Sequence, residues 1–124
     1  MNTLMSKITD AELKVMRVLW AAKEALPMAT IRETLEKTSD WESSTIKTLL
    51  RRLCEKGVVS SIKKDVLYYS PLVSETEYKE YKTERLIDRL YRGSAKNLVA
   101  SLVEGDKLNK SDIEELRSLF KVGE

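Results

Sequence analysis

Apolar residues recur at intervals of three and four in the stretch DWESSTIKTLLRRLCEKG, residues 40–57, and this spacing predicts an amphipathic helix. One side of that helix carries Ile46, Leu49, Leu50 and Leu53. The other side carries Ser44, Thr45, Lys47, Thr48, Arg51 and Arg52. Taken alone, the pattern is most typical of an ordinary helix with a solvated polar face. The residues that follow the helix change that interpretation.

Two short runs rich in β-branched and aromatic residues come directly after this helix, at 58–62 and 66–69, with Lys63, Lys64 and Asp65 between them. Such runs predict a β-hairpin, here with two lysines at its tip. A cationic helix followed at once by a basic hairpin is typical of a winged helix, in which the helix enters the DNA major groove and the wing lies beside it. We therefore predict binding to double-stranded DNA.

Two shorter helices are predicted before this one. Thr9 and Glu12 have the spacing of a capping box, so the first helix is expected to begin at Thr9. The second is expected at about residues 29–36, and a polar turn joins it to the basic helix as in a helix-turn-helix. Trp20 is interpreted as a core residue, and so is Trp41, with stacking of Trp41 on DNA as the alternative.

The C-terminal part predicts three more helices, at about residues 74–91, 95–104 and 109–120. Roughly fifty residues cannot cover the apolar surface of three such helices, so we expect a two-fold dimer to cover it. The alternative is that these helices fold back onto the winged helix within one chain. The residues expected at the dimer interface are Leu86, Leu90, Leu98, Leu102, Ile113, Leu116, Leu119 and Phe120.

The predicted fold class is therefore mainly α with a small β-hairpin. Residues 1–73 are expected to form a winged-helix DNA-binding domain and residues 74–124 a helical dimerisation domain. The length of 124 residues and the 42% hydrophobic content suit one compact domain with an appendage. No run of apolar residues is long enough to span a membrane, and the first ten residues lack the apolar segment of a signal peptide. These features predict a cytoplasmic protein without membrane insertion.

Composition argues against an enzyme or a metal site. The chain has no histidine, a single cysteine at Cys54 and no glycine-rich phosphate loop. Without a nucleophile paired to a base, the usual catalytic arrangements are missing. One cysteine cannot build a thiolate metal site, so no metal and no cofactor is expected.

The distribution of charge along the chain is more informative about binding than the net charge of +2. Residues 47–64 hold six cations and one acid, whereas residues 74–124 hold ten cations and eleven acids. Positive charge is thus concentrated in the predicted helix and hairpin, as phosphate neutralisation requires. The alternative is a winged helix that binds an acidic protein partner. Only DNA binding predicts steep salt dependence together with a preference for a palindrome.

Residues 8–120 resemble the BlaI/MecI family of penicillinase and methicillin-resistance repressors, which also includes the copper-operon repressor CopY. The resemblance is carried by ITDAELKVMRVLW, DWESSTIKTLLRRLCEKG, YYSPLVSETEYK and SLVEGDKLNKSDIEELRSLF, which together span most of the chain. It implies a dimeric cytoplasmic repressor of transcription, with an N-terminal winged helix, a C-terminal dimerisation domain and an operator made of inverted half-sites.

The resemblance also implies roles for individual residues. The positions that would read bases are Ser44, Thr45, Thr48 and Arg52. The positions that would contact the DNA backbone are Ser43, Lys47, Arg51, Lys63 and Lys64. One departure is that family members often have Ser-Pro after the tryptophan, whereas this chain has Glu42-Ser43. A glutamate there suits the helix N-terminus but repels a nearby phosphate, so the preferred half-site stays open.

The signal that releases the DNA is open as well. In the penicillinase branch an Asn-Phe bond of the C-terminal domain is cut after a membrane sensor detects a β-lactam. The matching position here is Ser101-Leu102, which has neither residue of that bond. The copper branch uses paired C-x-C motifs near the C-terminus, and this chain has no cysteine after Cys54. Three alternatives remain for the release of DNA. It is triggered by a protease or sensor, by a small ligand between the dimer helices, or by neither.

Overall fold

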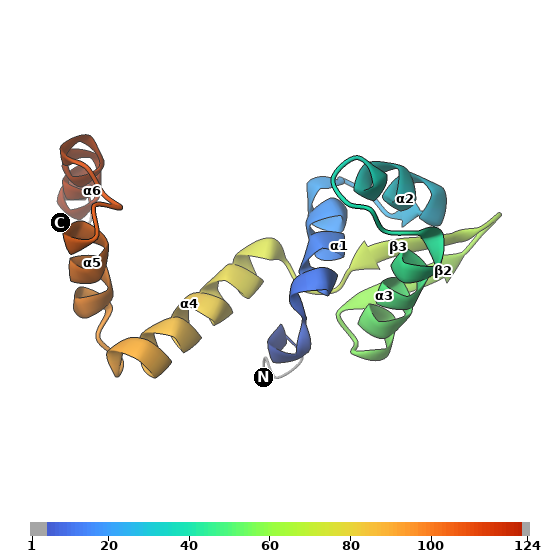
Figure 1. Cartoon of the computed structure of the whole chain (residues 1–124), viewed down its shortest axis with the longest axis horizontal. Coiled ribbons are helices and arrows are strands. Elements are labelled where there is room, and N and C mark those ends of the chain that lie inside the picture. The colour runs from blue at the N-terminus through green and yellow to red at the C-terminus, as the bar shows by residue number, and fades with distance from the viewer. Residues whose placement is uncertain (1–4, 123–124) are drawn as a thin grey trace. The chain divides into compact units, whose positions relative to one another are not determined.

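The computed structural model describes residues 5–122, and it confirms a mainly helical fold with a small antiparallel sheet. The elements are η1 (Met5–Lys7), α1 (Asp10–Ala21), β1 (Leu26–Pro27), α2 (Met28–Glu36), α3 (Ser43–Glu55), β2 (Val59–Lys63), β3 (Leu67–Pro71), α4 (Glu75–Tyr91), α5 (Ala95–Glu104) and α6 (Lys110–Val122) (Figure 1). The chain divides into two compact units, of which the first ends at Tyr81 and the second begins at Lys82.

Helix α1 begins where the capping box predicts. The Glu12 amide donates to Thr9 Oγ1 at 3.2 Å, and the Thr9 amide donates to Glu12 Oε1 at 3.0 Å. These two bonds satisfy amides that the first helical turn would otherwise leave unpaired. Val15, Met16 and Leu19 then form the buried side of the helix.

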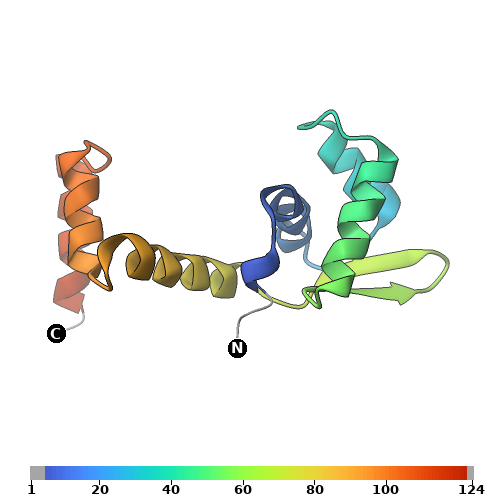
Figure 2. The same ribbon diagram turned by 60° about the horizontal axis from the view of Figure 1, so that its bottom comes forward.

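Helices α2 and α3 form the predicted helix-turn-helix and pack with α1 around one core (Figure 2). Ile31 and Leu35 are the buried residues of α2. All four apolar positions predicted for α3, from Ile46 to Leu53, are buried. Trp41 is half-buried against this core, with Lys14 Nζ 5.4 Å from its ring centroid, which supports its interpretation as a core residue.

The sheet contains the predicted hairpin and one strand that the sequence did not predict. Strands β2 and β3 pair antiparallel over five positions, from Val59 opposite Pro71 to Lys63 opposite Leu67. The two-residue strand β1 pairs with the other edge of β3, so the strand order is β1-β3-β2. A strand of two residues is too short to show any periodicity. Its proline lies on an edge strand, where a missing amide donor is tolerated.

The start of α4 packs against the winged helix. Ser74 and Glu77 form a capping box at the predicted start of this helix, with reciprocal bonds of 2.9 and 3.0 Å. Tyr78 is buried, and its ring centroid lies 5.6 Å from that of Trp20. Trp20 Nε1 donates to the Val73 carbonyl at 2.9 Å. The expected domain boundary at residues 73/74 thus marks the start of α4, whereas the first compact unit continues to Tyr81.

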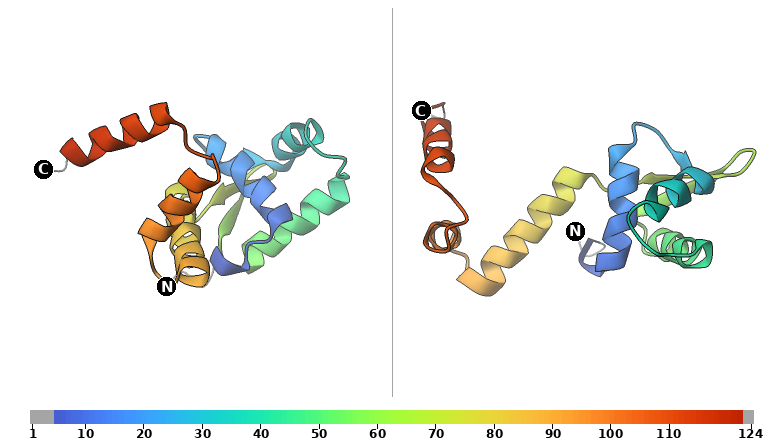
Figure 3. Two further views of the ribbon diagram at one scale, coloured as in Figure 1. Left: turned by 60° about the vertical axis from the view of Figure 1, so that its left-hand side comes forward. Right: turned by 45° about the horizontal axis from the view of Figure 1, so that its top comes forward.

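In the second unit, a short loop connects α5 to α6, which are shown in orange and red in Figure 3. Ser94 caps α5 by accepting from the Asn97 amide at 3.1 Å. Asn109 and Asp112 cap α6 through reciprocal bonds of 2.8 and 3.1 Å, at the predicted start of the last helix. Gly93, at φ +85°, occupies the left-handed conformation that ends α4.

Candidate nucleic-acid interface

Helix α3 turns its apolar side to the core and a polar side outward. Ser44, Thr45 and Arg52 are exposed, while Thr48 is half-buried. The Thr48 hydroxyl donates to the Ser44 carbonyl at 2.9 Å, so its oxygen and its methyl group remain available. Within residues 5–122 the Arg52 guanidinium has no carboxylate partner. The four predicted base-reading positions therefore share one accessible side of the helix.

Lys56 does not belong to the cationic surface. Its Nζ lies 2.6 Å from Glu12 Oε1 and also donates to the Lys7 carbonyl at 2.6 Å. Glu12 is 1% exposed, so this ion pair is withdrawn from solvent at the end of α3 away from Ser44. Lys56 is one of the six cations of residues 47–64, and the prediction that it neutralises phosphate is wrong because Glu12 already balances its charge. The sequence alone does not show this pairing with a buried acid of α1.

Arg51 is also paired, but in a different way. Its Nη1 lies 3.1 Å from Glu55 Oε2, one turn along the helix, and both side chains are more than half exposed. An exposed pair of this kind is worth well under about 1 kcal/mol, so Arg51 can exchange Glu55 for another anion.

The wing places two lysines at its tip. The Lys64 amide donates to the Val66 carbonyl at 2.9 Å and closes the turn. Lys63 and Lys64 are both exposed, and Lys64 Nζ lies 5.6 Å from the ring centroid of Tyr68. In Figure 2 the hairpin extends from beside α3 past the end of the helical core. The predicted hairpin is confirmed, and its tip carries two exposed lysines.

A further cation that the sequence analysis missed lies on α2. Arg32 Nη1 donates to Ser43 Oγ at 3.3 Å, and Arg32 Nε lies 3.7 Å from Glu36 Oε1. In sequence Arg32 belongs to an unremarkable polar face of α2. No sequence signal predicts its contact with the start of α3, because the contact depends on how the two helices cross.

Comparison with known proteins agrees with this architecture. The family model described as penicillinase repressor matches residues 8–121. The chain is 36% identical over 116 residues to the penicillinase repressor of Bacillus licheniformis, covering 93% of this chain and 90% of that protein. It is 34% identical over 115 residues to the methicillin resistance regulatory protein MecI of Staphylococcus aureus (strain N315), covering 92% and 93%. The chain belongs to the penicillinase repressor family.

Two solved structures of the repressor BlaI resemble part of this chain. The solution structure of the DNA-binding domain of the repressor BlaI matches with a TM-score of 0.54 at 36% identity, covering 60% of this chain and 90% of that one. Monomeric BlaI of Bacillus licheniformis in complex with the blaP half-operator matches with a TM-score of 0.52 at 38% identity, covering 58% and 88%. The family consists of repressors rather than enzymes.

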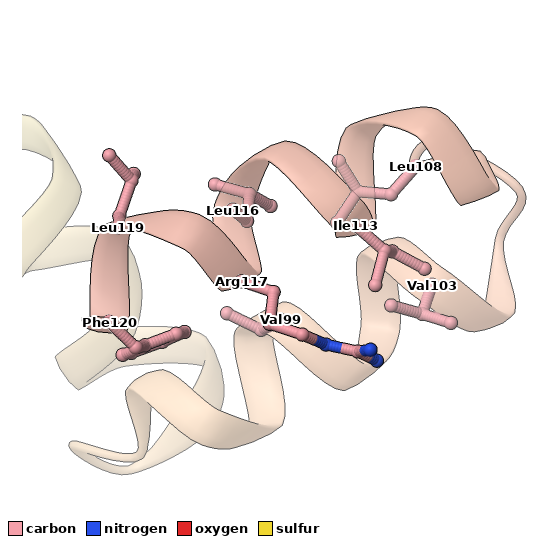
Figure 4. Close-up of a pocket in the computed structure, with 8 residues that line it drawn as sticks. All are labelled: Val99, Val103, Leu108, Ile113, Leu116, Arg117, Leu119 and Phe120. Atoms are coloured by element: carbon pink, nitrogen blue, oxygen red, sulfur yellow. The ribbon is translucent and has the colours of Figure 1, made fainter. Parts of the chain in front are cut away.

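The second unit of this family member carries a largely apolar surface. Val99 and Val103 of α5 face Leu108 and residues of α6 around a hollow of about 560 Å³ (Figure 4). Of the expected interface residues, Leu98, Leu102 and Ile113 are half-buried, and Leu86, Leu90, Leu116, Leu119 and Phe120 are exposed. Phe120 is 76% exposed, and α5 has no buried residue. The unit thus leaves its own apolar side chains uncovered.

The candidate cleavage position of the penicillinase branch lies inside a helix. Ser101 and Leu102 are half-buried in α5, and the Tyr91 hydroxyl donates to Ser101 Oγ at 3.0 Å. Among the residues that the structure describes, no group of three or more His, Cys, Asp or Glu side chains could hold a metal ion. No helix among them is long and apolar enough to cross a membrane.

The reactivity of the Cys54 thiol is a chemical probe of whether α3 is folded. Burial raises the pKa of its thiol above the usual value, and this outweighs a hydrogen bond to Ser61 that lowers it. Because only the thiolate reacts, we expect iodoacetamide to modify the folded chain more slowly than the urea-unfolded chain at the same pH. The pH midpoint of the rate should be higher in the folded chain, measured by mass spectrometry over a pH series. Coincident pH profiles would contradict the burial of the thiol.

Proposed function

We propose that this family member is a transcriptional repressor of the cytoplasm that binds an inverted-repeat operator in double-stranded DNA. The observation that carries this proposal is the accessible hydroxyl and guanidinium side of α3 beside a lysine-tipped wing. A fold of the same kind and 38% sequence identity links it to BlaI, which was solved on the blaP half-operator. Placement of α3 in a major groove would let its exposed side read base edges.

The geometry supports distinct chemistry for each base-reading side chain. Arg52 has a free fork of donors that suits guanine O6 and N7. Thr48 has already donated its proton to the Ser44 carbonyl, so its hydroxyl can only accept, while its methyl group suits thymine. Ser44 and Thr45 lie one turn earlier, with exposed hydroxyls for bases or sugars.

Backbone contacts are proposed for the rim of this surface. The residues are Ser43, Lys47, Arg51, Lys63 and Lys64. Ser43 accepts from Arg32 and keeps its own proton for a phosphate oxygen. Lys47 and the two wing lysines are exposed point charges without a carboxylate partner among the described residues. Such contacts orient the protein on DNA without reading sequence.

The same proposal assigns residues 1–73 to DNA binding and residues 74–124 to dimerisation. Its support is the exposed apolar side of α5 and α6, which a second copy would cover. Two-fold pairing would place two recognition helices on the two halves of a palindrome.

Release by a partner protease at Ser101-Leu102 would need α5 to open first. Proteases bind substrate in extended form, whereas both residues lie in the middle of a helix, and Ser101 accepts a bond from Tyr91. An unfolded second unit would also end the proposed pairing. The supporting geometry is equally compatible with a sensor or ligand that opens α5 without cutting it.

Fluorescence-anisotropy titration of the DNA upstream of the protein's own gene, with a scrambled duplex as control, tests the proposal. We expect tight binding that weakens steeply with salt and favours the native sequence. Equal binding to both duplexes, or none, would overturn operator recognition and favour the alternative of an acidic protein partner.

Arg52→Ala should lower operator affinity by about 1–3 kcal/mol and relax the preference at one base pair of each half-site. The reason is that alanine removes both donors of the proposed guanine contact. Arg51→Ala is the matched comparison, because Arg51 is proposed to contact phosphate and should weaken operator and scrambled DNA alike. Equal weakening of both duplexes by Arg52→Ala would move Arg52 to the backbone class.

A further inference from the structure

Between α2, α3 and the wing lies a surface groove that is lined by three cations and no acid. Its volume is about 580 Å³. The cations are Arg32 of α2, Lys47 of α3 and Lys63 of the wing. Pro27, Met28, Ala29, Val66, Leu67 and Tyr69 line the rest. Cations from α2, α3 and the wing thus line one hollow beside the proposed recognition surface.

We propose that this groove holds the sugar-phosphate backbone of one operator strand, and that Arg32 is a third phosphate-binding cation within it. The inference rests on the proposed function and extends its DNA surface from α3 and the wing onto α2. A guanidinium forms paired donors to phosphate, whereas the two lysines act as point charges around it. The apolar lining suits the carbon atoms of a deoxyribose that enters between them.

The present partners of Arg32 are weak enough to be exchanged. Its contact with Glu36 is an exposed pair one helical turn apart, at 3.7 Å, with side chains 47% and 56% exposed. Solvent and salt screen such a pair. A phosphate held beside Lys47 and Lys63 would attract the Arg32 guanidinium more strongly than the Glu36 carboxylate does. The bond from Arg32 Nη1 to Ser43 Oγ orients the side chain toward the start of α3. Arg32 is therefore positioned at the groove by Ser43, and its weak pair with Glu36 leaves it able to bind a phosphate.

The two wing residues Val66 and Leu67 support the same occupant. They are 47% and 41% exposed, and with Met28 they supply apolar lining of the groove. A large protein partner would need a broader apolar surface than this. A lining with three cations and no acid matches a polyanion better than a neutral or cationic ligand.

The decisive experiment measures binding of operator and scrambled duplexes by the full chain between about 50 and 200 mM salt. Arg32→Gln should weaken both duplexes by a similar factor and reduce the slope of log K against log salt by about 0.9 for each bound protomer. Arg32→Lys should restore most of that slope, because it keeps the charge. The matched control is Lys79→Gln, which removes an equal charge from an exposed pair one turn apart, at 3.6 Å from Glu75.

Each result decides between explanations. If Arg32→Gln keeps the wild-type slope, or only matches Lys79→Gln, the groove does not hold a phosphate. If Arg32→Lys fails to restore the slope while Arg32→Gln lowers it, Arg32 acts by supporting Ser43 rather than by its charge, and the proposal is overturned. Failure of the wild-type chain to prefer the operator would instead overturn the proposed function. A second variant, Met28→Glu, tests the groove itself, because a carboxylate there should weaken both duplexes whereas Met28→Leu should not.

Discussion

Replacing Leu116 with aspartate is expected to convert the proposed dimer to monomers and to lower operator affinity by at least about 100-fold. Leu116 is 40% exposed in one chain and lines the hollow between α5 and α6. A carboxylate at this position would be buried in an interface whose lining is apolar apart from Arg117, and the cost of desolvating it would oppose association. Loss of pairing removes the gain from binding two half-sites at once, which reaches factors of about 10²–10⁴.

Sedimentation velocity measures the first effect and anisotropy on the full palindrome measures the second. Ser111→Asp is the control, because it adds the same charge to the exposed first turn of α6 without entering the hollow. Far-UV circular dichroism should stay close to wild type in both variants. A Leu116→Asp chain that sediments like the wild-type chain would remove this surface from the proposed interface. Binding to an isolated half-site should change little, because the substitution leaves the winged helix intact.

Replacing Glu12 with alanine is expected to lower the free energy of unfolding by about 3 kcal/mol. Glu12 Oε1 accepts from the Thr9 amide and from Lys56 Nζ, and the residue is 1% exposed. Alanine removes the acceptor of the Thr9 amide, which is half of the capping box, and leaves the Lys56 ammonium without its carboxylate. We expect the low end of the range for a broken buried pair, because the Lys56 side chain is 23% exposed and regains some water.

Urea denaturation followed by circular dichroism measures this loss. Glu12→Gln keeps an acceptor for the Thr9 amide and should lose less than alanine does. Glu55→Ala is the control, since it breaks the exposed pair with Arg51 and should cost less than about 1 kcal/mol. Equal midpoints for Glu12→Ala and Glu55→Ala would show that the buried pair contributes nothing beyond an exposed one.

Local pattern was sufficient to predict most elements of this chain. Three of the helix starts are set by side chains three residues from their partners, at Thr9, Ser74 and Asn109. The apolar spacing of α3 identified its buried side, and β-branched runs around two lysines identified the wing. These features depend on backbone propensity and on neighbours within one turn, which the order of residues determines directly. The sequence also determined which side chains α3 offers to a partner.

Only the tertiary structure decided which cations remain available for an anion. Glu12 and Lys56 are 44 positions apart, and their pairing removes Lys56 from the surface that the sequence assigned to it. Arg32 reaches Ser43 across the crossing of α2 and α3, and it reaches the groove only because the wing folds beside both helices. Strand β1 exists only through its pairing with β3. Contacts of this kind arise from the packing of remote segments around a shared core, and periodicity within a segment carries no information about them.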